Sequence, residues 1–187
     1  MGTVCVVSFV VCIASFLWAM AGNFFQRVEP PSRGFRAIQV LGGASIVVTL
    51  WAYSMSAVTP EAGAAGLMLY AGSFALFWAS IRVHWSSPPS HAFSMDIPTH
   101  LVEVGPYRYL RHPCYSAYVL TWLAGAVATM RLTPALAAAV MFVLYHRAAT
   151  LEEAKYATST LASAYAAYQR QTGRFVPKFK APCHESR

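Results

Sequence analysis

The sequence predicts an all-α fold: a polytopic membrane helical bundle of about five transmembrane helices, with the last two as a hairpin, followed by a C-terminal amphipathic helix. Composition, segment length and the placement of basic residues favour this fold. Hydrophobic residues make up 57% of the 187 residues and charged residues only 11%, whereas soluble globular proteins carry about 25% charged residues. The mean hydropathy is +0.44. These values place the chain in a membrane.

Five segments meet or approach the roughly 20 apolar residues that cross a bilayer. The last two are short and are separated only by Arg131, Thr133 and Pro134, so we expect a tight helical hairpin. Pro134 suits the first turn of a helix, where its missing N–H has no intrahelical partner to lose. The expected spans cover residues 4–21, 37–58, 65–81, 115–130 and 132–145.

The basic residues gather in every second connection between the apolar segments, as a chain with five membrane spans requires. Thirteen of the fourteen Lys and Arg lie in the first loop, the third loop and the C-terminal tail, and only Arg131 lies elsewhere. By the positive-inside rule, those three regions face the cytoplasm. No Lys or Arg precedes Arg27, so the first span is expected to be retained rather than cleaved as a signal peptide. We expect an integral, multi-pass protein of a bacterial-type cytoplasmic membrane, with its C-terminus and active site cytoplasmic.

Nucleic acid and metal are not expected as partners. The formal net charge is +7, but the basic residues lie beside the apolar spans, where anionic lipid head groups explain them more simply. The four cysteines form no CxxC or CxH pattern. His84, His91 and His100 are separated by prolines and do not share a helical face, whereas a metal site needs convergent ligands.

Residues 154–171 are expected to form the short amphipathic helix. Leu161, Tyr165 and Tyr168 follow an i, i+4, i+7 spacing on one face. The helix should end at Thr172-Gly173 and continue into an extended segment. We expect it to rest at the membrane surface or to fold back over the bundle.

The most informative segment is residues 105–115, with the sequence GPYRYLRHPCY. Charge so close to hydrocarbon is costly and usually serves a function. Pro113 suits the first turn of the fourth helix, so Arg111 and His112 should lie at the N-terminus of that helix. Unpaired N–H groups and the helix dipole favour an anion at such a place.

A second cluster, Glu152-Glu153, follows the last apolar run. Its carboxylates can accept hydrogen bonds from a diol or an amine, and the tyrosines of the 105–115 segment offer ring faces to a cation. S-adenosylmethionine carries a carboxylate, an amine, a diol and a sulfonium cation, and would fit both clusters. Solvated charges near lipid head groups are the alternative interpretation.

The two clusters, the hairpin between them and the segment from Tyr165 to Pro177 resemble the isoprenylcysteine carboxyl methyltransferase family, which belongs with the membrane phospholipid methyltransferases. The resemblance covers about residues 100–179. It implies S-adenosylmethionine bound at the cytoplasmic ends of the last helices, in a pocket that the C-terminal segment caps and that opens to the lipid. It implies a cofactor-binding set of Tyr107, Arg111, His112, Pro113, Tyr115, Glu152 and Glu153, and catalytic residues Arg174 and Arg170 that face the acceptor.

The favoured function is therefore carboxyl O-methylation of a lipophilic, isoprenylcysteine-like acceptor, which is either a small molecule or a lipidated chain. A phospholipid amine or another small molecule is an alternative acceptor. Ala117 and Ala162 stand where the family usually has glycine, which leaves a non-enzymatic membrane scaffold open. A sterol-reductase-like enzyme that uses NADPH is also open, although such enzymes tend to have Asn at the position of Cys114.

We expect one integrated domain. Residues 1–99 would supply the N-terminal transmembrane helices and a cytoplasmic loop, residues 100–180 the methyltransferase-like core, and residues 181–187 a disordered tail. Membrane lipids are the expected surroundings. The sequence does not predict an oligomeric state.

Overall fold

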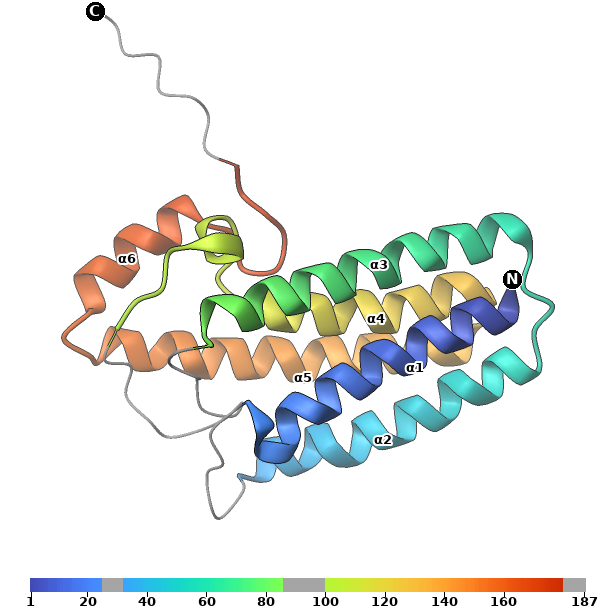
Figure 1. Ribbon diagram of the computed structural model, residues 1–187. Coiled ribbons are helices and arrows are strands. Elements are labelled where there is room, and N and C mark those ends of the chain that lie inside the picture. Colours follow the sequence, from blue (N-terminus) through green and yellow to red (C-terminus); the bar gives the residue numbers. More distant parts are fainter. Residues whose placement is uncertain (25–31, 86–99, 180–187) are drawn as a thin grey trace, which may run out of the picture.

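The computed structural model describes residues 1–24, 32–85 and 100–179, and these form an all-helical bundle (Figure 1). Within those ranges, extended pairing is confined to an isolated parallel bridge between Leu110 and Gly173. The elements are α1 (Gly2–Trp18), the π-helical turn η1 (Ala19–Asn23), α2 (Arg33–Ser54), α3 (Pro60–Val83), the 3₁₀ turn η2 (Gly105–Arg108), α4 (Pro113–Thr129), α5 (Leu132–Ala157) and α6 (Ala162–Gln171).

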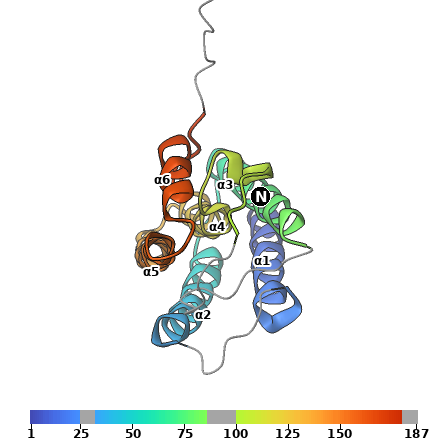
Figure 2. The same cartoon turned by 90° about the vertical axis from the view of Figure 1, so that its left-hand side faces the viewer.

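Four helices are long and apolar enough to cross a membrane: α1 together with the start of η1, then α2, α3 and α5. The predicted polytopic helical bundle is thereby confirmed, and the protein is an integral membrane protein. The remaining long helix, α4, has 17 residues and is about 26 Å long at 1.5 Å per residue. It lies at the centre of the bundle and contacts α1, α2, α3 and α5 (Figure 2).

The helix ends follow from local chemistry. Ser32 accepts a hydrogen bond from the Phe35 N–H and caps α2, and Thr59 caps α3 in front of Pro60; such caps pair N–H groups that the helix itself leaves free. The predicted α4–α5 hairpin is confirmed. Met130 adopts a left-handed conformation with φ of 52°, and α5 begins two residues later, with Pro134 in its first turn.

Small residues let the central helices approach closely. A Cβ added to Gly66 of α3 would lie 2.7 Å from the Ala128 Cβ of α4. The Ser73 hydroxyl of α3 donates to the Ala117 carbonyl at 2.7 Å. Such close packing replaces the hydrophobic driving force that is missing between helices in lipid. Ala117, one of the two departures from the family's glycine pattern, is thus fully buried at the α3–α4 interface.

The predicted helix over residues 154–171 is wrong in its extent. The helix α5 continues through Glu152-Glu153 to Ala157, and α6 starts only at Ala162. Between them, the Thr158 hydroxyl donates to the Lys155 carbonyl and the Ser159 hydroxyl donates to the Tyr156 carbonyl while accepting from the Leu161 N–H. These side-chain bonds compete with the helical ladder and turn the chain.

The turn folds α6 back against the end of α5. The rings of Tyr156 and Tyr165 stack with their centroids 4.0 Å apart, and Tyr165 and Tyr168 are buried. The sequence predicted that these two tyrosines share a face of the helix. Of the two expected positions, at the membrane surface or folded back over the bundle, the second is observed. The expected tail at 181–187 and His91 lie outside the described residues.

Candidate functional site

The C-terminal segment, defined as residues 172–179, returns to the N-terminus of α4. The Arg111 N–H donates to the Gly173 carbonyl at 2.8 Å, the His112 N–H to the Arg174 carbonyl at 3.2 Å, and the Gly173 N–H to the Tyr109 carbonyl at 3.0 Å. A Cβ on Gly173 would lie 1.8 Å from the Val176 carbonyl oxygen, so only glycine permits this turn. The segment thereby brings its own side chains to α5.

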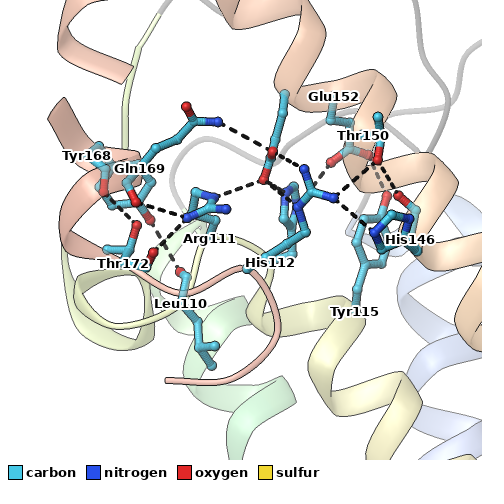
Figure 3. A network of polar contacts seen from close by, with 12 residues as sticks. Leu110, Arg111, His112, Tyr115, His146, Thr150, Glu152, Tyr168, Gln169 and Thr172 are labelled. Atoms are coloured by element: carbon cyan, nitrogen blue, oxygen red, sulfur yellow. Dashed lines mark hydrogen bonds and ion pairs between the residues drawn. The ribbon is translucent and has the colours of Figure 1, made fainter. Parts of the chain in front are cut away.

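Glu153 accepts hydrogen bonds from three side chains of a polar network, which Figure 3 shows around Arg111, His112 and Gln169. Its Oε1 accepts from Arg111 Nε at 2.9 Å and from Arg174 Nε at 3.2 Å, and lies 3.1 Å from His112 Nε2. Its Oε2 accepts from Arg174 Nη2 and, at 3.4 Å, from Gln169 Nε2. The Glu153 side chain is only 7% exposed. This carboxylate therefore joins α5 to the α4 N-terminus, α6 and the C-terminal segment.

Arg111 extends the network to the end of α6. Its Nη1 donates to the Thr172 carbonyl at 2.6 Å and to the Gln169 carbonyl at 3.3 Å. The last carbonyls of a helix have no intrahelical partner, so this guanidinium satisfies groups that would otherwise be unpaired. Arg111 is thus oriented toward protein partners on both sides.

Glu152 has different surroundings from its neighbour. It accepts a hydrogen bond from the Tyr115 hydroxyl, and its Oε2 lies 3.6 Å from His112 Nδ1. Its side chain is 29% exposed. Because successive residues of a helix point about 100° apart, the two carboxylates cannot both enter the buried network. Glu152 is therefore the more exposed member of the pair.

The N-terminus of α4 adjoins Glu152. His112 is its N-cap residue, Pro113 is in its first turn, and no side chain caps it; its first N–H groups have no intrahelical acceptor. The His112 and Tyr115 rings stack with centroids 5.6 Å apart, and Tyr115 stacks on Tyr145 at the same separation. This end of α4 offers donors for an anion, and the rings beside Glu152 suit a cation.

Tyr107 lies apart from the network. Its ring meets the His84 ring edge-on at 4.9 Å, and its carbonyl accepts from the Tyr168 hydroxyl at 2.7 Å. Burial raises the pKa of the Tyr107 phenol well above its ordinary value, so the phenol stays protonated at neutral pH. Its contacts connect η2 to α3 and α6.

Arg170 also lies outside the network. It is exposed on α6, and its side chain makes no hydrogen bond or ion pair with the part of the chain that the structure describes. Of the nine residues proposed from the sequence, six are joined by hydrogen bonds, ion pairs or ring contacts, and Pro113 starts the helix that carries Tyr115 and follows His112. The six are Arg111, His112, Tyr115, Glu152, Glu153 and Arg174.

Sequence reasoning missed His146 and Thr150. Arg174 Nη1 donates to Thr150 Oγ1 at 3.3 Å and lies 3.1 Å from His146 Nε2. These two residues precede Glu153 at i, i+4, i+7 spacing on α5, so the helical period would have placed them on the face of the glutamate. They extend the site toward the outer side of α5.

The comparisons with known proteins identify a family. The family model described as Phospholipid methyltransferase matches residues 62–164. The match is more than half of the chain and includes the motif at the α4 N-terminus and both glutamates. No curated protein matches the chain at a significant level.

Proposed function

The chain belongs to the phospholipid methyltransferase family, which includes the isoprenylcysteine carboxyl methyltransferases, and is a membrane methyltransferase; on that premise we propose that it methylates the carboxylate of a lipophilic acceptor from S-adenosylmethionine. The observation that carries the proposal is the different burial of the two glutamates. Glu153 orders the network, whereas Glu152 stays accessible beside an uncapped helix end. We further propose that this site faces the cytoplasm.

The residues present fit the chemistry of S-adenosylmethionine. Its carboxylate would be held by the N–H groups at the start of α4. Its amine or its diol would bind Glu152, an acceptor that is partly exposed. When bound, the cofactor supplies an electrophilic methyl group.

The protein's task in this reaction is orientation. A carboxylic acid with a pKa near 4 is ionised at neutral pH, so no side chain has to remove a proton. Arg174 is 29% exposed at the outer edge of the network, where its charge favours an anionic group. Holding two reactants in line lowers a barrier by about 7–11 kcal/mol, and the rigid Glu153 network supports that alignment.

Equilibrium binding of S-adenosylmethionine to purified protein in nanodiscs tests the cofactor site. Glu152→Gln should weaken binding about 10- to 100-fold, because hydrogen bonds to a charged group contribute about 1.5–3 kcal/mol. Glu61→Gln is the matched control, since Glu61 is an exposed glutamate in the first turn of α3. Undiminished binding by Glu152→Gln would refute the assignment of this residue.

Membranes incubated with methyl-labelled S-adenosylmethionine test the acceptor. We expect label in base-labile methyl esters. Label in phospholipid head groups instead would identify an amine acceptor, as the family's name suggests, and would refute carboxyl methylation while keeping the methyltransferase assignment.

A further inference from the structure

His146 is an exposed residue on α5 that borders the Glu153 network without belonging to it (Figure 3). Its Nε2 lies 3.1 Å from Arg174 Nη1. Arg174 is held in place because its Nε and Nη2 both donate to Glu153. The guanidinium that faces His146 Nε2 is therefore anchored by Glu153.

The chemistry of the guanidinium determines the tautomer of His146. A guanidinium has only donors, so Nε2 must be the unprotonated, accepting nitrogen. The proton of the neutral ring then lies on Nδ1. Thr150 adds to this arrangement, since its hydroxyl accepts from Arg174 and donates to the His146 carbonyl at 2.9 Å. The exposed ring consequently presents an N–H donor at its free nitrogen.

The surroundings of that donor are apolar on the membrane side. Rings of Phe142 and Phe175 lie with their centroids 6.1 and 6.2 Å from the His146 ring. Phe142 and Val143 are exposed one turn before His146 on α5, and Leu136 is exposed nearer the start of that helix. The Nδ1–H group thus lies at the polar end of an apolar stripe, beside the positive charge of Arg174.

We propose that His146 is a specificity-determining residue, whose Nδ1–H binds an oxygen of an acceptor carboxylate while the acceptor's apolar chain lies along α5. This inference rests on the proposed function and assigns the residue that selects a carboxylate acceptor. An ammonium group has only donors and cannot accept from this N–H. In the transfer, a carboxylate oxygen gains the methyl group, the electron pair of the carbon–sulfur bond stays with sulfur, and no proton is released. His146 undergoes no covalent change.

Kinetics with S-farnesylcysteine as the probe acceptor test the residue. His146→Leu should raise the KM for this acid about tenfold, the effect of losing one hydrogen bond to a charged group, with kcat and cofactor affinity within about twofold. His146→Gln should restore the KM, because its amide can accept from Arg174 and donate to the acid. Arg147→Gln, at the adjacent exposed position, is the control. A wild-type KM in His146→Leu would overturn the inference.

A second measurement does not depend on turnover. The ¹⁵N chemical shifts of His146 should show a protonated Nδ1 and an unprotonated Nε2 at neutral pH; the opposite tautomer would overturn the inference. Wild-type protein that binds no S-adenosylmethionine would refute the proposed function, and this inference with it. Wild-type protein that methylates only phosphatidylethanolamine in vesicles would refute the proposed carboxyl methylation, and this inference with it. Wild-type protein that methylates S-farnesylcysteine, with an unchanged KM in His146→Leu, would refute this inference alone.

Discussion

The substitution Glu153→Gln removes the one negative charge that two arginines share. Arg111 and Arg174 are 12% and 29% exposed at their side chains, and both donate to this carboxylate. Breaking a buried ion pair by removing one partner costs about 3–5 kcal/mol. Because Arg174 is partly solvated, we expect the low end, about 3 kcal/mol, which corresponds to roughly a hundredfold change in an equilibrium constant.

The loss should be local, because Glu153 holds α6 and the C-terminal segment rather than the membrane-spanning helices. Hydrogen exchange measured by mass spectrometry in nanodiscs gives the readout. The Arg111, His112 and Gly173 amides are hydrogen-bonded between the segment and the α4 N-terminus, and their exchange should be about a hundredfold faster in Glu153→Gln. Glu152→Gln, which alters the partly exposed glutamate, should leave that exchange unchanged. Equal protection in wild type and Glu153→Gln would refute the structural role of the network.

Two further changes test the packing around the site. Gly173→Ala places a methyl group 1.8 Å from the Val176 carbonyl oxygen and should detach the C-terminal segment, seen as rapid proteolysis near residue 173, whereas Gly72→Ala, with open space around it, should not. Tyr168→Phe leaves the Tyr107 and Leu110 carbonyls without their donor and should lower the free energy of unfolding by about 1–3 kcal/mol. Burial raises the pKa of the Tyr168 phenol, so the wild type should lose stability as pH rises above about 10, the ordinary phenol value. The Tyr168→Phe variant should lose less stability than the wild type over that pH range. Thermal unfolding temperatures that fall in parallel with pH in the two proteins would contradict this account.

Helix positions were predictable where local chemistry decides them. Pro113 and Pro134 lie in the first turns of α4 and α5, as their missing N–H groups require. The break between α5 and α6 was not predictable from periodicity, since it depends on the hydroxyls of Thr158 and Ser159 bonding to the backbone. Residues of that kind also occur inside helices, so their presence alone does not end one.

The sequence predicted most of the residues of the site, but not what each of them contacts there. Glu152 and Glu153 are adjacent and chemically identical in the sequence, and which of them is buried depends on partners distant in the chain, such as Arg111, 42 residues away. Contacts at that separation depend on how the whole bundle packs. Arg170 is a different case. It is two residues from Tyr168, about 200° around the helix, so the periodicity that identified the buried face of α6 also indicates that Arg170 points away from it.

The return of residues 173–178 to the start of α4 has a consequence for biogenesis. The apolar helices can enter the membrane one after another as the chain emerges, but Arg174 reaches Glu153 only after the last of these residues has been translated. A nascent chain that already spans the membrane therefore lacks an ordered site. The order of synthesis thus delays completion of the Glu153 network until after membrane insertion, and a tag fused close behind residue 178 would disturb the step that completes it.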